Sequence, residues 1–218
     1  MSRQFDLLVF DWDGTLMDST GMIARSIQRS FADVGLPEPS DEAARFVIGY
    51  GLHEAMQYLA PELEQSKIQQ VVDAYRGHFL AKDHELQLYA GVKECLPRLQ
   101  AAGFRLAVAT GKSRAGLNRV LAATELAPYF EATRTADEAF SKPHPAMLEY
   151  ILDVTDVPAE RAVMIGDTTH DLQLAINAGT ASLAMSYGAH PLIDLLPLNP
   201  LAHFDDFSAL TDWILVHG

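Results

Sequence analysis

Four short, largely apolar runs constrain the fold of this chain more than any other feature of its sequence. Each is four or five residues long, and the runs cover residues 7–10, 105–109, 162–165 and 182–185. Runs of this kind are typical of strands that a parallel sheet buries on both faces. Segments with helical spacing of their apolar residues lie between them. The alternation predicts an α/β fold with a doubly wound parallel sheet, that is, a Rossmann-like core.

One long interval, residues 18–89, interrupts this alternation of strands and helices. It contains no strand pattern, and its apolar residues follow two helical stripes: Ile23, Ile27, Phe31 and Val34, then Ile68, Val71, Val72, Tyr75 and Phe79. We therefore predict a helical domain at residues 18–89, inserted after the first strand of a core formed by residues 1–17 and 90–218. The expected hinges lie near residues 17–20 and 83–91.

Composition excludes several classes of function. The formal net charge is −13 and the sequence has no basic run, which argues against a nucleic-acid partner and against an anionic membrane surface. The single cysteine, Cys95, cannot form an internal disulfide. The N-terminus lacks the pattern of a secretory signal, and no apolar run approaches membrane-spanning length. We therefore expect a cytoplasmic protein with no membrane or nucleic-acid partner.

Polar residues follow the predicted strands at the points where the strands end. They are Asp11 and Asp13, Thr110 and Gly111, and Asp167 and Asp171, with Lys142 in an intervening loop. Because the carboxyl ends of parallel strands meet at one edge of the sheet, we expect these residues to converge on one crevice. Three or four carboxylates would then face a single ammonium group. Such a cluster either raises carboxylate pKa values or recruits a divalent cation, and its all-oxygen ligands favour Mg²⁺.

A crevice that holds Mg²⁺ and Lys142 can accept a phosphate dianion. Thr110 can donate its hydroxyl, and Gly111 its backbone N–H, to the phosphate oxygens. A carboxylate that attacks phosphorus forms an acyl phosphate, and a second carboxylate nearby can protonate the leaving alcohol and later deprotonate water. Asp11 and Asp13 are two residues apart, a spacing that suits these two roles, with Asp11 as the nucleophile and Asp13 as the general acid and base.

The ordered motifs also carry a family resemblance. D-W-D-G-T-L, T-G, the K-P of S-K-P-H-P, and G-D-T-T-H-D occur in that order, and together they resemble the motifs of the haloacid dehalogenase-like phosphohydrolase superfamily. V-I-G-Y-G at residues 47–51 and Y-A-G-V at residues 89–92 are similar to the phosphoglycolate phosphatase-like branch. The resemblance implies that the helical insert is a cap domain, which closes over the site and selects the substrate.

The resemblance also implies a role for each motif residue. Asp11 would be the nucleophile and a Mg²⁺ ligand, and Asp13 the acid and base and a ligand through its main-chain carbonyl. The remaining implied contacts are Thr110 and Lys142 with the phosphate and the nucleophile, Asp167 with Mg²⁺, and Asp171 with metal-bound water.

Several residues keep two interpretations at this point. Asp171 either supports the metal site or stabilises the start of a helix, where acidic residues are favourable. The loop of Gly49, Tyr50 and Gly51 either connects two helices or brings backbone N–H groups over the substrate. Arg45 either binds a substrate carboxylate or lies on a solvated helix surface. His144 and His170 flank the site, as substrate contacts or as bystanders.

The predicted function is hydrolysis of a small phosphate ester, with phosphoglycolate as one candidate substrate. A phosphosugar mutase on the same scaffold is an alternative, and only the cap would distinguish the two. A non-enzymatic receiver-type signalling module also uses an aspartyl phosphate and Mg²⁺, but that class predicts a shorter chain without an insert.

Overall fold

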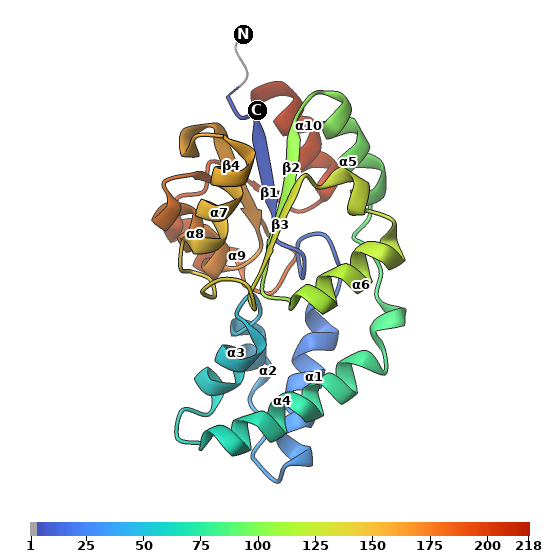
Figure 1. Cartoon of the computed structure of the whole chain (residues 1–218), viewed down its shortest axis with the longest axis vertical. Helices are drawn as coiled ribbons and strands as arrows, with labels where there is room; N and C mark the ends of the chain where they lie inside the picture. Colours follow the sequence, from blue (N-terminus) through green and yellow to red (C-terminus); the bar gives the residue numbers. More distant parts are fainter. Residues whose placement is uncertain (1–3) are drawn as a thin grey trace.

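Six parallel strands form one sheet in the computed structural model, which describes residues 4–218. The strands lie in the order β3-β2-β1-β4-β5-β6, and the sheet occupies the upper part of the molecule (Figure 1). Their bounds are β1 Leu7–Phe10, β2 Arg105–Thr110, β3 Ala132–Thr135, β4 Ala162–Gly166, β5 Ala181–Met185 and β6 His203–Phe204. The predicted α/β class and its parallel sheet are confirmed. The strands at the two edges of the sheet, β3 and β6, were not predicted from the sequence.

Helices cover both faces of this sheet because the side chains of each strand alternate between the faces. Leu8 and Phe10 belong to an apolar cluster with α5, α6 and α10, whereas Leu7 and Val9 belong to a cluster with α7 and α8. The helix bounds are α5 Val92–Ala101, α6 Arg114–Thr124, α7 Ala146–Thr155, α8 Thr169–Ala178, α9 Leu192–Leu195 and α10 Phe207–His217. Short 3₁₀ turns lie at η1 Asp83–Glu85, η2 Ala127–Tyr129, η3 Ala159–Arg161 and η4 Leu196–Leu198.

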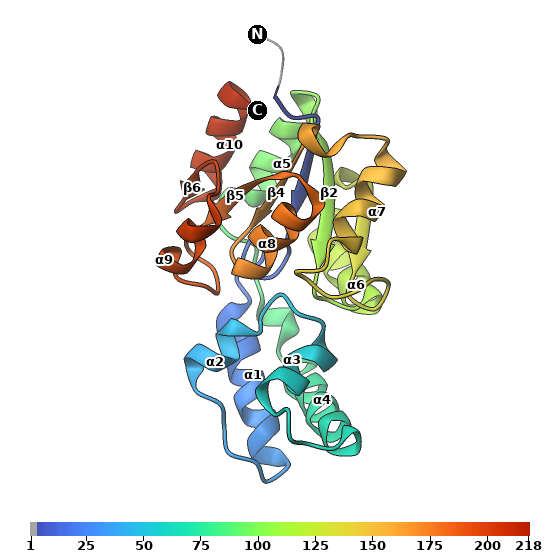
Figure 2. The same ribbon diagram turned by 90° about the vertical axis from the view of Figure 1, so that its left-hand side faces the viewer.

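Four helices between β1 and α5 form a bundle below the carboxyl edge of the sheet (Figure 2). They are α1 Thr20–Asp33, α2 Asp41–Phe46, α3 Leu52–Leu59 and α4 Gln65–Leu80, and we call them the helical bundle. The two predicted stripes meet inside it, since Ile23, Ile27 and Phe31 of α1 share an apolar cluster with Ile68 and Val71 of α4. The bundle thus has an apolar core made almost entirely of its own residues, with Ala189 as the one buried contribution from the sheet domain among the described residues.

The chain enters and leaves the helical bundle through two linkers that lie side by side. The N–H of Asp18 donates to the carbonyl of Gln87 at 2.9 Å, and the N–H of Tyr89 donates to the carbonyl of Leu16 at 2.9 Å. The linkers therefore form a short two-stranded connection between sheet and bundle. Among residues 4–218 no helix combines the length and apolar character needed to cross a membrane.

Candidate active site

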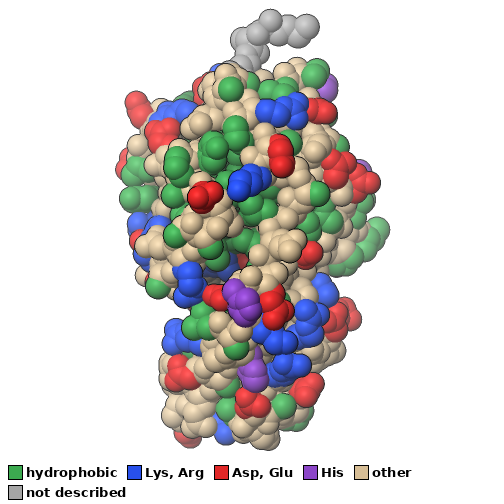
Figure 3. Space-filling model, turned by 90° about the vertical axis from the view of Figure 1, so that its right-hand side faces the viewer, with side chains coloured by type: hydrophobic (Ala, Val, Ile, Leu, Met, Phe, Trp, Pro, Cys, Tyr) green, Lys and Arg blue, Asp and Glu red, His purple; other side chains and the backbone are tan. Residues whose placement is uncertain are grey.

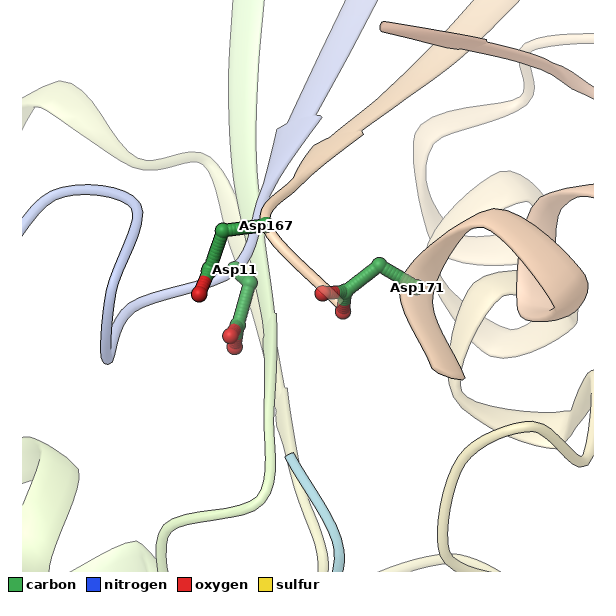
Figure 4. A group of neighbouring side chains, drawn as sticks. All are labelled: Asp11, Asp167 and Asp171. Atoms are coloured by element: carbon green, nitrogen blue, oxygen red, sulfur yellow. The ribbon is translucent and has the colours of Figure 1, made fainter. Parts of the chain in front are cut away.

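Three buried carboxylates meet at the carboxyl edge of the sheet. Asp11 follows β1, Asp167 follows β4, and Asp171 lies in the first turn of α8 (Figure 4). One carboxylate oxygen of each lies within 4.8 Å of the others, and at most 1% of each residue is exposed. Burial of three acids at this distance is unfavourable unless cations or hydrogen-bond donors compensate for their charge.

Lys142 is the one cation among the described residues in direct contact with this cluster, and it is as deeply buried as the acids. Its Nζ lies 2.8 Å from Oδ1 of Asp11 and donates to Oδ1 of Asp171 at 2.6 Å. Burial alone would lower the pKa of Lys142, but the two carboxylates hold it above its ordinary value. Lys142 is therefore charged at neutral pH.

Asp171 makes the contacts of a helix cap as well as an ion pair. Its Oδ2 accepts from the N–H of Thr168 at 3.1 Å and from the Thr168 hydroxyl at 2.7 Å, in the capping box that begins α8. Burial acts to raise the pKa of Asp171, and the Lys142 ammonium with these hydrogen bonds more than offsets it, so the pKa is lowered. Asp171 is therefore ionised and holds Lys142 beside Asp11.

Asp167 fits into a space that two glycines leave open. Its Oδ1 accepts from the Thr15 hydroxyl at 2.6 Å, and its Oδ2 accepts from the N–H of Ala189 at 2.7 Å. A Cβ atom on Gly14 or on Gly188 would lie 2.1 Å from Oδ2. Gly14 also has a φ of +85°, which side chains disfavour. Glycine is thus required at both positions for the carboxylate to lie here.

Asp11 differs from its neighbours because no backbone N–H and no hydroxyl group of the described residues donates a hydrogen bond to its buried oxygens. Its polar contact among the described residues is the Lys142 ammonium, whose Nζ lies 2.8 Å from Oδ1. Burial raises the pKa of Asp11 to about 7 against the opposing effect of Lys142, and Asp171 adds to the rise. Burial, Asp11 and Asp171 likewise raise the pKa of Asp167. The carboxylate oxygens of Asp11 and Asp167 can hold a divalent cation, whose charge would favour the ionised form of both residues.

Asp13 lies apart from the three-carboxylate cluster and faces a cavity. Its Oδ1 accepts from the Ser19 hydroxyl at 2.6 Å, and its Oδ2 lies 2.9 Å from Nζ of Lys112. Lys112 was not among the residues predicted from the sequence, although it directly follows Thr110 and Gly111. The two contacts fix the direction in which the Asp13 carboxylate points.

Thr110 and Gly111 lie at the end of β2. The Thr110 hydroxyl is buried and accepts from the N–H of Lys112 at 3.2 Å. A Cβ atom on Gly111 would lie 2.5 Å from the carbonyl oxygen of Tyr50 and 2.7 Å from that of Gly49. A residue without a side chain therefore lets the loop at residues 47–51 lie directly on the strand end.

Two histidines hold that loop against the sheet domain. Nε2 of His170 and Nε2 of His190 both donate to the Phe46 carbonyl, at 2.7 and 3.0 Å. Nδ1 of His190 accepts from the N–H of Thr169 at 3.0 Å, which leaves its proton on Nε2. Burial lowers the pKa of His170 to about 4, so this ring is neutral at physiological pH. The Tyr50 ring stacks on His170 with centroids 4.0 Å apart.

Three further residues that were candidates for substrate contact, Gly51, Arg45 and His144, make contacts with the protein itself. The N–H of Gly51 donates to the Ser141 hydroxyl at 2.7 Å, so Gly51 contacts the loop that carries Lys142. Arg45 pairs with Asp41 at 2.8 Å and does not line the cavity. Nδ1 of His144 accepts from the N–H of Ala146 at the start of α7. His144 thus supports a helix, whereas His170 supports the loop of the bundle.

A cavity of about 540 Å³ separates the helical bundle from the sheet edge. Asp11, Asp13, Gly111 and Lys112 line it on the sheet side. The bundle side is lined mainly by apolar and aromatic residues, among them Ile23, Ile27, Val47, Ile48, Tyr75 and Phe79. A molecule in this cavity would place one end at the carboxylates and the other end against the bundle.

The chain is similar in sequence and in structure to haloacid dehalogenase-like hydrolases and to proteins named as phosphatases. The model of the family described as haloacid dehalogenase-like hydrolase matches residues 8–185. The probable phosphatase IndB of Dickeya dadantii is 34% identical over 209 residues, which are 93% of this chain and 90% of that protein. A phosphoglycolate phosphatase of Psychrobacter arcticus is 32% identical over 222 residues, 96% of this chain and 95% of that protein. The crystal structure of a predicted phosphoglycolate phosphatase from Haemophilus somnus has a TM-score of 0.83 at 28% identity, covering 97% and 99% of the two chains.

The raised pKa of Asp11 predicts a pH dependence of stability in metal-free protein. Between the ordinary value of 3.8 and about 7 the unfolded chain has lost this proton whereas the folded chain keeps it. The free energy of unfolding should therefore fall as the pH rises through this range, by about 1–4 kcal/mol from this group. In Asp11→Asn the free energy of unfolding should no longer show this decrease with pH. Urea unfolding in EDTA at a series of pH values measures it.

Asp153→Asn is the matched control, because Asp153 is exposed on α7. It should keep the wild-type profile. A profile for Asp11→Asn that coincides with the wild-type profile between pH 4 and pH 7 would contradict the account of Asp11 as a buried, raised carboxyl group.

Proposed function

This chain belongs to the haloacid dehalogenase-like hydrolase family and is a phosphatase, and we propose that it hydrolyses small phosphate esters through a Mg²⁺-dependent aspartyl phosphate on Asp11. The observation that carries the proposal is the state of the Asp11 carboxylate. It lines the cavity beside the Lys142 ammonium, and no backbone N–H or hydroxyl group of the described residues donates to its two oxygens, so that Oδ2 has no partner. Such an oxygen is available to attack phosphorus.

The first step transfers the phosphoryl group to the protein. An oxygen of Asp11 attacks phosphorus, the P–O bond of the ester breaks, and the leaving alkoxide takes a proton from the carboxyl group of Asp13. Water then attacks phosphorus, its proton returns to Asp13, and the bond between Asp11 and phosphorus breaks. Ser19 and Lys112 support this assignment because they fix the direction of the Asp13 side chain on the cavity wall.

The phosphate oxygens need donors and positive charge at the same place. Lys142 supplies an ammonium that is already beside Asp11, and we assign the Thr110 hydroxyl and the Gly111 N–H as further donors. The carboxylates of Asp11 and Asp167 and the main-chain carbonyl of Asp13 would hold the Mg²⁺ ion. When bound, Mg²⁺ offsets the negative charge that the phosphate and the carboxylates bring together. Asp171 is assigned to support metal-bound water and to position Lys142.

The helical bundle is assigned as the cap, with residues 18–89 as the cap domain and residues 1–17 and 90–218 as the core. Its separate apolar cluster and its paired linkers support this division. The loop at residues 47–51 rests on Gly111 and is held through the Phe46 carbonyl. In this arrangement Gly49, Tyr50 and Gly51 close one side of the cavity, which limits the access of bulk water to the phosphoryl group.

The substrate is assigned as a small phosphorylated metabolite. Phosphoglycolate is the first compound to test, because several relatives carry the name phosphoglycolate phosphatase. The phosphatase relatives also favour transfer to water over the mutase and signalling alternatives.

Substitution of the two aspartates tests the proposed roles. Asp11→Asn should abolish phosphate release from every ester, because an amide does not attack phosphorus. Asp13→Asn should reduce kcat by about 10²–10⁴-fold, the usual contribution of a general acid and base. Both effects are measured as phosphate release from a panel of esters in Mg²⁺ and in EDTA, with Asp153→Asn as the control.

Wild-type protein should release phosphate in Mg²⁺ and lose the activity in EDTA. Near-normal turnover by Asp11→Asn, from protein with a native circular dichroism spectrum, would rule out Asp11 as the nucleophile. Equal wild-type activity in Mg²⁺ and in EDTA would rule out the metal requirement.

Lys112 provides a separate prediction, because it contacts Asp13 without belonging to the carboxylate cluster. Lys112→Met should lower kcat by about 10-fold or more through loss of the Asp13 orientation, and Lys112→Arg should restore part of it. The matched control is Lys93→Met, since Lys93 is 65% exposed and its nearest acidic partner is 3.9 Å away. Unchanged steady-state kinetics in Lys112→Met would show that the contact with Asp13 has no role in turnover.

A further inference from the structure

We propose that the preferred substrate is the phosphate ester of an uncharged alcohol whose body is apolar and about the size of an aromatic ring, larger than glycolate. The inference rests on the proposed function, because it takes Asp11 as the group that receives the phosphoryl group. It follows from the size of the cavity, from the apolar side chains on its bundle side, and from the acidic partners that its Lys and Arg side chains already have.

The size of the cavity exceeds what glycolate requires. Its volume is about 540 Å³, within the range of roughly 300–1,000 Å³ in which proteins enclose drug-sized ligands. A phosphoryl group at Asp11 and a two-carbon acid would leave most of this space to water. A leaving group that fills the cavity would displace that water from apolar surface, which favours binding.

The wall that α1 and α4 contribute to the cavity is largely apolar. Ile23 and Ile27 of α1 face the cavity together with Tyr75 and Phe79 of α4. The rings of Tyr75 and Phe79 stack, with centroids 5.7 Å apart and an interplanar angle of 14°. Aromatic and branched side chains of this kind bind ring-shaped or extended apolar groups, whereas a carboxylate against them would lose hydration without compensation.

The cations that line the cavity already have acidic partners. Lys112 lies 2.9 Å from Asp13. Arg76 pairs with Asp73 at 3.3 Å, and Arg119 pairs with Asp83 at 2.9 Å. Figure 3 shows basic and acidic side chains intermixed at the waist between sheet domain and bundle. Among the described lining residues no Lys or Arg is left without an acidic partner to bind the carboxylate of a substrate.

The acids of the lining reinforce this conclusion. Glu54 and Asp137 line the cavity in addition to Asp11 and Asp13. Mg²⁺ and Lys142 compensate for charge at the phosphate end in the proposed function, but the remainder of the cavity offers a substrate no surplus of positive charge. An uncharged leaving group therefore fits the cavity better than an anionic one.

The test compares three esters of primary alcohols, so that the chemistry of the leaving oxygen stays similar. They are 2-phenylethyl phosphate, ethyl phosphate and phosphoglycolate, each assayed for phosphate release in Mg²⁺. A single methylene in an apolar pocket changes kcat/KM by about 10-fold or more. We therefore expect kcat/KM for 2-phenylethyl phosphate to exceed both other values by at least about 10-fold.

Variants of the cavity wall locate the source of the preference. Tyr75→Ala should reduce the ratio of kcat/KM for 2-phenylethyl phosphate to that for ethyl phosphate by about 10-fold, because it removes part of the aromatic wall. Ala115→Trp should also reduce this ratio by filling the cavity from α6, where Ala115 is exposed and lines the cavity. His78→Ala is the matched control, since His78 lies on α4 outside this cavity, and it should keep the wild-type ratio.

The outcomes separate this inference from the proposed function. Equal or higher kcat/KM for phosphoglycolate, in an assay that remains dependent on Mg²⁺ and Asp11, would overturn the inference and leave the phosphatase mechanism intact. A ratio that neither Tyr75→Ala nor Ala115→Trp alters would also overturn it. Absence of phosphate release from all three esters by folded wild-type protein would overturn both.

Discussion

The buried ammonium of Lys142 is the interaction on which the rest of the site depends. It lies between Asp11 and Asp171 with contacts of 2.8 and 2.6 Å, and removal of a partner from such a buried pair typically costs about 3–5 kcal/mol. Asp171 is in turn fixed by the capping box of α8. The first turn of α8 therefore fixes the Lys142 ammonium beside Asp11, the proposed nucleophile. The contacts that stabilise the start of this helix also position a group of the proposed reaction.

The position of Asp167 and the close approach of the bundle to the sheet both depend on residues without side chains. Gly14 and Gly188 leave space for the Asp167 carboxylate, and Gly111 lets the carbonyls of Gly49 and Tyr50 lie on the end of β2. Two neutral histidines then share the Phe46 carbonyl. This arrangement leaves a cavity that Asp11 and Asp13 line on the sheet side and mainly apolar residues line on the bundle side, which suits a phosphate ester with an apolar leaving group.

Much of this arrangement could be predicted from the sequence, because buried parallel strands are uninterrupted apolar runs. The strands at residues 7–10 and 162–165 are confirmed within one residue. Because these strands are parallel neighbours, Asp11 and Asp167, which directly follow them, lie at the same carboxyl edge of the sheet. Two edge strands were missed: β6 has only two residues, and β3, with the sequence A-T-R-T, is too short and polar to be distinguished from a loop. His190 was missed because its contact with the Phe46 carbonyl depends on the direction of side chains in three dimensions. Lys112 was missed although it directly follows Thr110 and Gly111, because only the fold shows that its side chain turns toward Asp13. Arg45 was a candidate from sequence, but its partner Asp41 lies one helical turn away.

The formation of an acyl phosphate on Asp11 is the central claim, and rapid acid quench followed by peptide mass spectrometry tests it most directly. Wild-type protein mixed with excess ester and Mg²⁺ should carry one phosphoryl group on the peptide that contains Asp11, at a level that falls as the substrate is consumed. Hydroxylamine should remove the label, because it cleaves acyl phosphates. A phosphoryl group on any other residue, or phosphate release with no label at any quench time, would contradict the account.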